Sequence, residues 1–381
     1  MSRHVVSILL LLVGFVRCAR GAEEGELQIA DGRLQRGGAE VRAVGVNYFD
    51  CFLRTLTRGE TTSYEEGFAV LAEYEIPFAR FCATGYWPSE LKLFQADRAE
   101  YFRRMDLVVR SAEKHGIGLI PSLFWWLACV PDLVKEPVSA WGDPSSKTHE
   151  FMREYVQAVV SRYAPSPSIW AWEFGNEYSL VGDLPNAMAN LPAVQTELGT
   201  QATRTARDAL TYDQIAVAFR EFGREVRKYD PVRPITTGDA ILRTTGWHNR
   251  AEHNWKKDSA EESEEMLKLM NPDPVGLISI HCYGEDLMRI GEAARAAASL
   301  GKPLFLGEFQ VKELDSPEAR VRFEKVLAEL EAHKVALAAI WVFDFAGQEG
   351  EFNIRRGNGR EWELEMIREA NRRIRAEAER R

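Results

Sequence analysis

The sequence predicts an α/β fold, a (β/α)8 or TIM barrel preceded by a short N-terminal β-hairpin, and two observations lead to this prediction. Apolar runs of strand length alternate with longer segments of helical period along the chain, with eight of each. No glycine-rich dinucleotide fingerprint follows the first strand, which disfavours an open, doubly wound sheet. We therefore expect a single barrel domain over residues 22–381.

The expected elements follow one another without a low-complexity linker. Turn signals at Asp31-Gly32 and Gly37-Gly38 predict the hairpin. The expected barrel strands are apolar runs over 43–47, 77–82, 116–124, 168–174, 233–238, 275–283, 302–309 and 336–343. The expected helices cover 63–74, 98–116, 147–163, 212–229, 263–270, 286–301, 317–334 and 361–380. Two long insertions, 181–210 and 240–262, follow strands and should lie at the C-terminal face of the barrel, where such folds keep their active sites.

Residues 1–21 have the layout of a secretory signal peptide. Arg3 and His4 precede a 12-residue apolar run that ends at Val16, and small residues follow. This run is short for a membrane span. Lipid attachment at Cys18 is disfavoured because Arg17 stands where a small residue is needed. We expect an exported protein, extracellular or periplasmic, with no membrane association after cleavage.

Charge and cysteine content exclude several classes of partner. Loss of residues 1–21 removes three arginines and no acid, which changes the net charge from −9 to about −12. An acidic protein is a poor ligand for nucleic acid or anionic membranes.

The remaining cysteines, Cys51, Cys82, Cys129 and Cys282, permit disulfides without fixing a pairing, and Cys282 is expected to be a buried thiol. No Cys/His cluster predicts zinc, so we expect no metal, including at His248 and His253, and no cofactor.

The C-terminal ends of the expected strands carry the chemistry, because side chains from different barrel strands meet only there. Two carboxylates, Glu177 after strand four and Glu308 at the end of strand seven, should face each other across the mouth. Glycoside hydrolysis requires such a pair, one acid to protonate the leaving oxygen and a second to attack the sugar or activate water. Taken alone, Glu177 could instead open a solvated loop. The other residues at these ends are Asn47, Tyr48, Arg80, Phe124, Trp125, Trp126, Asn176, Asp239, His281, Tyr283, Trp341 and Asp344.

Five motifs, in chain order, resemble clan A glycoside hydrolases, most closely the family 5 cellulase and mannanase group. They are FARF (78–81), FGNEY (174–178), IHCY (280–283), LFLGEF (304–309) and IWVF (340–343). The resemblance runs from Ala43 to about Phe345. It implies that Glu177 is the acid/base and Glu308 the nucleophile of a retaining mechanism.

The same resemblance implies roles for the neighbouring residues. Asn176 would bind the 2-hydroxyl of the reacting sugar, and Arg80 and Tyr283 would hydrogen-bond the nucleophile. His281 would lie beside the acid/base, and Trp341 would stack beneath the sugar. Each residue has a structural alternative, such as an ordinary ion pair for Arg80 or a core position for Trp341.

Two departures from the family pattern leave the substrate open. Tyr178 stands where proline commonly follows the Asn-Glu pair, and the third strand ends in SLFWWL (122–127) in place of a histidine. Trp125, Trp126, Trp87, Trp247 and Trp255 lie near the expected catalytic face and predict several sugar subsites. We therefore expect a secreted β-glycosidase whose only predicted partner is carbohydrate, of mannan or glucan type. A transglycosidase and an inactive carbohydrate-binding barrel stay open as alternatives, as does exo against endo cleavage.

Overall fold

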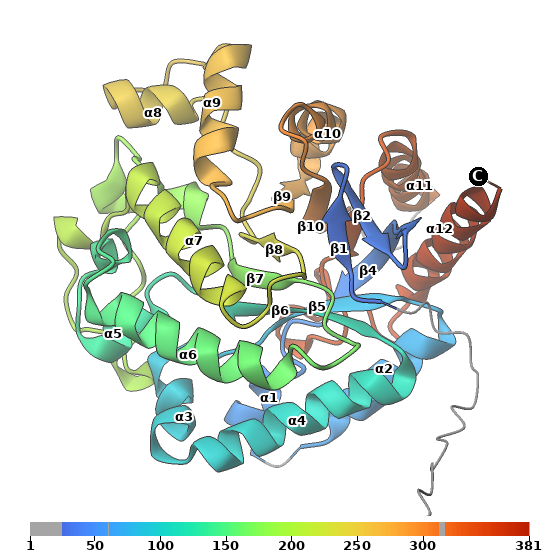
Figure 1. The fold of residues 1–381 in the computed structure, drawn as a ribbon, viewed down its shortest axis with the longest axis horizontal. Helices are drawn as coiled ribbons and strands as arrows, with labels where there is room; N and C mark the ends of the chain where they lie inside the picture. The colour runs from blue at the N-terminus through green and yellow to red at the C-terminus, as the bar shows by residue number, and fades with distance from the viewer. Residues whose placement is uncertain (1–24, 60, 312–316, 381) are drawn as a thin grey trace, which may run out of the picture.

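The computed structural model describes residues 25–59, 61–311 and 317–380; the expected signal peptide lies outside them. Eight parallel strands form one sheet, in the order β8-β7-β6-β5-β4-β11-β10-β9 (Figure 1). They are β4 (Ala43–Asn47), β5 (Phe78–Cys82), β6 (Gly118–Phe124), β7 (Trp172–Gly175), β8 (Ile235–Thr236), β9 (Ile278–Tyr283), β10 (Leu304–Gln310) and β11 (Leu337–Ile340). A parallel bridge between Thr236 and Leu277 joins the two edge strands. The sheet is therefore a nearly closed barrel, as the sequence predicts.

The fifth barrel strand is shorter than expected. The sequence pattern predicts 233–238, whereas β8 keeps only two residues. Gly238 has φ +70°, and a Cβ there would lie 2.0 Å from the carbonyl oxygen of Gly175. The chain thus turns against the end of β7 at a position that only glycine can occupy. This turn brings the segment after β8 next to the residues that follow β7.

A small antiparallel sheet packs under the N-terminal end of the barrel. It has three strands, β1 (Gln28–Ala30), β2 (Arg33–Arg36) and β3 (Ala39–Glu40), so the expected hairpin gains a third short strand. Leu27 and Leu34 are buried in a cluster with residues from the bottom of the barrel, among them Phe78 and Trp170. The cluster covers the end of the barrel opposite the strand exits.

The helices surround the barrel in Figure 1. The eight predicted ones are α2 (Ser63–Glu73), α4 (Arg98–His115), α6 (Lys147–Tyr163), α7 (Tyr212–Arg227), α9 (Ala260–Met270), α10 (Ile290–Ser299), α11 (Pro317–Ala332) and α12 (Glu361–Glu379). Four short ones, α1 (Leu53–Thr57), α3 (Lys92–Ala96), α5 (Cys129–Val134) and α8 (Gly246–Glu252), were not predicted because they are too short to show a helical period. Within the described residues, none of the helices has the length and apolar character needed to cross a membrane.

The four cysteines of the described chain are all buried free thiols. Burial raises the pKa of each thiol. A thiol in such surroundings behaves as a small apolar side chain. The disulfides that an even cysteine count would permit are therefore not formed in this fold.

Candidate active site

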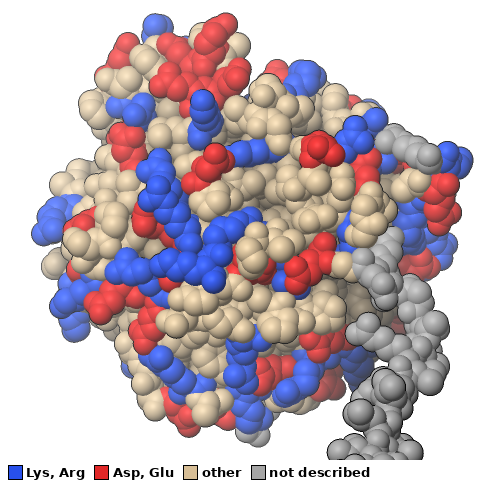
Figure 2. Space-filling model, viewed as in Figure 1, with Lys and Arg blue, Asp and Glu red and all other residues tan. Residues whose placement is uncertain are grey.

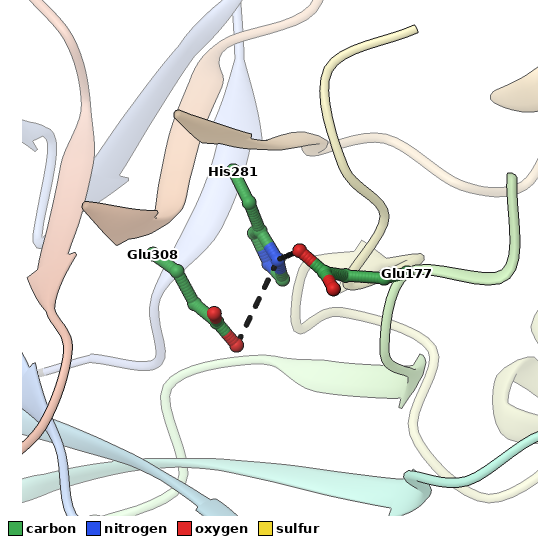
Figure 3. Close-up of side chains that lie close together, drawn as sticks. All are labelled: Glu177, His281 and Glu308. Carbon is green, nitrogen blue, oxygen red and sulfur yellow. Dashed lines mark hydrogen bonds and ion pairs between the residues drawn. The ribbon is translucent and has the colours of Figure 1, made fainter. Parts of the chain in front are cut away.

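Glu177 and Glu308 meet at the C-terminal mouth of the barrel (Figure 3). Glu177 lies two residues after the end of β7 in a left-handed conformation, φ 56°, and its backbone N–H donates to the carbonyl of Gly238. Glu308 lies within β10, where the pairing register with both neighbouring strands shifts. Both side chains point toward His281 of β9, whose Nδ1 lies 3.0 Å from Glu177 Oε1 and 3.7 Å from Glu308 Oε1. One carboxylate oxygen of Glu177 lies within 4.8 Å of one of Glu308.

Both oxygens of Glu308 receive a hydrogen bond, one from the buried Arg80 and one from the partly buried Tyr283. Arg80 Nη1 donates to Oε1 at 2.8 Å, and the Tyr283 hydroxyl donates to Oε2 at 2.7 Å. Charge-assisted bonds of this kind stabilise a carboxylate in its ionised form. Arg80 and Tyr283 thus hold Glu308 from two sides.

Arg80 is fully buried and is held on every side of its guanidinium group. Its Nε donates to Glu173 at 2.7 Å, and its Nη2 donates to Asn176 Oδ1 at 2.7 Å. Nη1 also donates to Asn47 at 2.9 Å, and the group lies over the Trp125 ring, 4.3 Å from the centroid. These contacts fix the plane in which the guanidinium faces Glu308.

Glu173 is a site residue that the sequence reading missed. It lies inside the barrel on β7, completely buried, and burial raises its pKa although the nearby Arg80 acts in the opposite direction. One signal was available, because Glu173 interrupts the otherwise apolar run SIWAWEF. A charged residue inside a buried strand requires a charged partner, which here is Arg80.

Burial controls the protonation of the two groups that face each other above Glu308. It raises the pKa of Glu177, against the opposing effect of Arg80. It lowers the pKa of His281 to about 3, so the imidazole is neutral near pH 7.

The two carboxylates open into a cleft of about 810 Å³ with aromatic walls. Its aromatic lining residues are Phe49, Tyr86, Trp87, Trp125, Tyr283, Trp341, Phe345 and Phe352. The Trp341 indole N–H donates to Gln348 at 2.6 Å, which fixes the ring that was expected to stack beneath the sugar. Trp126 packs behind the lining, with its ring 4.5 Å from that of Trp87 and stacked on Tyr86 at 5.8 Å.

Two of the predicted aromatic residues do not line this cleft. Trp247 lies on α8, where its indole N–H donates to Glu265 of α9 at 3.0 Å. Trp255 follows α8 and is half exposed, also outside the cleft lining. The loop after β8 leads away from the two carboxylates, and the sequence did not reveal this path. Phe49, Tyr86, Phe345 and Phe352 take part in the lining although the sequence reading did not select them.

Glu177, His281 and Glu308 also lie at separations that suit metal ligands. The Arg80 guanidinium already brings a positive charge to Glu308 at 2.8 Å. The arrangement thus pairs one carboxylate held by cationic and phenolic donors with a second whose pKa is raised. Two such carboxyl groups in an aromatic cleft at the mouth of a parallel barrel are the arrangement of a glycoside hydrolase.

The chain belongs to glycosyl hydrolase family 5, since the cellulase model of that family matches residues 81–346. A probable mannan endo-1,4-beta-mannosidase F of Aspergillus flavus is 44% identical over 237 residues, which cover 54% of this chain and 49% of the relative. Mannan endo-1,4-beta-mannosidase A of Podospora anserina is 39% identical over 97 residues, covering 23% and 25%. The matched regions span about half or less of the length of these relatives.

Solved structures share the fold at low sequence identity. The endo-1,4-beta-mannanase of Rhizomucor miehei superposes with a TM-score of 0.68 at 15% identity, covering 92% of this chain and all of that one. An exo-beta-1,4-mannosidase from an Opitutaceae bacterium gives a TM-score of 0.61 at 17% identity, covering 91% and 62%. Endo- and exo-acting enzymes therefore both occur on this fold.

Proposed function

We propose that this chain is a secreted, retaining endo-β-mannanase, which cleaves β-1,4 bonds within a mannan through a covalent glycosyl-enzyme. The observation that carries the proposal is the pair Glu177 and Glu308, which bring one oxygen of each carboxylate within 4.8 Å of the other. Retaining enzymes place their carboxyl groups about 5–5.5 Å apart, whereas inverting enzymes leave about 6.5–9.5 Å for a water molecule. The close pair supports double displacement.

In the first step a carboxylate oxygen of Glu308 attacks the anomeric carbon. The bond from that carbon to the leaving oxygen breaks, and the leaving oxygen takes the proton of Glu177. In the second step Glu177 removes a proton from water, the hydroxide oxygen bonds to the anomeric carbon, and Glu308 leaves as a carboxylate. The raised pKa of Glu177 supports its role as the acid, and the donors on Glu308 support its role as the nucleophile.

The supporting residues take roles that their contacts favour. Asn176 Oδ1 accepts from Arg80, which leaves the side-chain N–H groups of Asn176 free to donate to a sugar 2-hydroxyl. His281 is neutral and lies 3.0 Å from Glu177, so it can orient the acid without adding a competing charge. Trp341 provides an apolar surface for the reacting sugar.

The choice of mannan over glucan follows the names of the curated relatives, which are mannan endo-1,4-beta-mannosidases. The aromatic residues along the cleft can cover several sugars. This supports endo-acting cleavage within the chain over release of sugars from one end. Secretion rests on the signal-like pattern of residues 1–21.

A labelling experiment tests the two catalytic roles. A mechanism-based fluorinated mannoside should attach to Glu308, and Glu308→Gln should abolish both labelling and turnover. Glu177→Ala should lose most activity on mannan but retain the first step on aryl mannosides with good leaving groups, and azide should rescue the second step. Glu90→Gln, at a carboxylate that lines the same cleft, is the matched control and should label normally. Labelling at another residue would refute the assignment.

Product analysis tests the substrate and the mode of cleavage. The protein should release oligosaccharides of mixed length from β-1,4-mannan and act much more slowly on cellulose. Release of mannose alone from the start of the reaction would show an exo-acting enzyme. Faster turnover of cellulose would assign the chain to the glucanases of its family.

A further inference from the structure

A second group of potential ligands lies in the insertion after β8, away from the catalytic cleft. His248 of α8 is buried, with 1% of its surface exposed. Its Nδ1 lies 2.9 Å from Asp258 Oδ1 and 3.7 Å from Glu262 Oε2. On the other side of the ring, Nε2 lies 3.8 Å from Glu252 Oε2. Three carboxylates thus surround one imidazole.

His248 Nδ1 and Asp258 Oδ1 share a hydrogen bond of 2.9 Å, but hydrogen bonding within the protein leaves the other ring nitrogen without a partner. Asp258 accepts from the backbone N–H groups of Trp247 and His248, and Glu262 accepts from that of Ser259. His248 Nε2 is buried and has no hydrogen-bond partner. Within the described chain, the ion pairs of Glu252, Asp258 and Glu262 involve His248 alone. The imidazole therefore uses one of its two nitrogens in a hydrogen bond, and the other lies unpartnered in an acidic environment.

We propose that this group binds a divalent cation of the zinc type through His248 Nδ1, Asp258 Oδ1 and Glu262 Oε2. Zinc bonds to nitrogen and carboxylate oxygen are about 2.0–2.2 Å long, which places tetrahedral ligand atoms about 3.3 Å apart. The observed separations of 2.9 and 3.7 Å lie on either side of that value. Three protein ligands leave the fourth position for water.

Cation binding also gives the unpartnered nitrogen a role. The metal requires a bare Nδ1, so the neutral ring then carries its proton on Nε2. That N–H faces Glu252, which matches the carboxylate-histidine-metal arrangement common in protein metal sites. Two carboxylates and a neutral imidazole balance the charge of a divalent ion.

The surface around the group favours cations as well. In Figure 2 red side chains crowd the upper end of the molecule, over α8 and α9. The first turns of α9 contribute the exposed Glu261, Glu264 and Glu265. These charges attract a cation that the buried His248 can then bind.

The sequence expectation of no metal considered only His248 and His253 in this stretch. Asp258 and Glu262 follow His248 by 10 and 14 residues, across the loop between α8 and α9, and the fold alone brings them together. A bound cation would tie the loop 253–259 to α8 and α9. This role is structural and does not depend on the proposed catalytic function.

Zinc binding to the full chain tests the proposal. Protein freed of metal by a chelator should bind one Zn²⁺ per chain by calorimetry and unfold at a higher temperature with Zn²⁺. Co²⁺ in the same site should give the visible absorption of a four-coordinate ion. Mg²⁺ should bind much more weakly because it prefers oxygen ligands.

Matched variants locate the site. Glu262→Gln keeps an acceptor for Ser259 and should weaken Zn²⁺ binding at least about 10-fold. Glu264→Gln, on the exposed side of the same helix, should leave binding unchanged, and so should Glu308→Gln in the catalytic cleft. Absence of stoichiometric Zn²⁺ binding, equal effects of the two α9 variants, or loss of binding in Glu308→Gln would each overturn the proposal.

Discussion

Replacement of Asp239 by asparagine should remove a pH-dependent loss of stability. Asp239 follows β8, and its Oδ1 accepts hydrogen bonds from the backbone N–H groups of Ser179 and Ala240 at 2.9 and 3.0 Å. The second oxygen, Oδ2, is buried without a partner. Burial raises the pKa of the carboxyl from 3.8 to about 6, with a smaller contribution from the charge of Glu177. Asparagine keeps the accepting oxygen and cannot ionise.

The sign follows from the raised pKa. Well below pH 3.8 the carboxyl is protonated in both the folded and the unfolded chain, so it costs nothing. As the pH rises toward 6 the unfolded chain loses the proton first, and the free energy of unfolding falls until the folded carboxyl also ionises. A shift of about two pKa units, at about 1.4 kcal/mol per unit, makes this loss about 3 kcal/mol.

Urea unfolding followed by tryptophan fluorescence, at about pH 4 and about pH 7.5, measures the effect. Between these pH values the parent should lose about 2–3 kcal/mol more stability than Asp239→Asn, because all other titrating groups are common to both. Asp213→Asn, at an exposed position of α7, should behave like the parent. Equal losses in the parent and Asp239→Asn would show that Asp239 is not the buried acid that the structure describes.

Three further changes test the cleft, the barrel interior and the packing. Trp87→Ala should lower kcat/KM on mannan by about fivefold more than on an aryl mannoside, since a stacking contact contributes about 1 kcal/mol. The control Trp247→Ala should affect both substrates equally, because its ring lies outside the cleft lining. Glu173→Ala should lower kcat at least about 10-fold with little change in KM, because Arg80 loses the hydrogen-bond partner of its Nε. Glu173→Gln should restore much of the rate. An unchanged kcat in Glu173→Ala would contradict the positioning role of Glu173. Gly67→Ala should cost about 1–3 kcal/mol in urea unfolding, because its Cβ would lie 2.0 Å from the Tyr48 hydroxyl, while Gly246→Ala, with its nearest contact at 3.5 Å, should cost nothing.

Much of the fold, and the meeting of two carboxylates at the mouth of the barrel, could be predicted from the sequence. Strand and helix periods are local properties, and eight alternating pairs specify the barrel before any contact is known. The barrel in turn dictates that residues at strand ends meet. Glu177, Glu308, Arg80 and Tyr283 were found in this way, because each stands at or near the exit of a strand.

The remaining features depend on contacts between segments that are far apart in the chain. The partnership of Glu173 with Arg80 requires the closed barrel, in which the interiors of β5 and β7 share one buried space. The path of the loop after β8 decides that Trp247 packs against α9, and no local pattern records that path. The same path places Asp258 and Glu262 around His248. A sequence determines which elements form, since propensity and period act over a few residues, whereas the position of a loop side chain is the outcome of packing over the whole molecule.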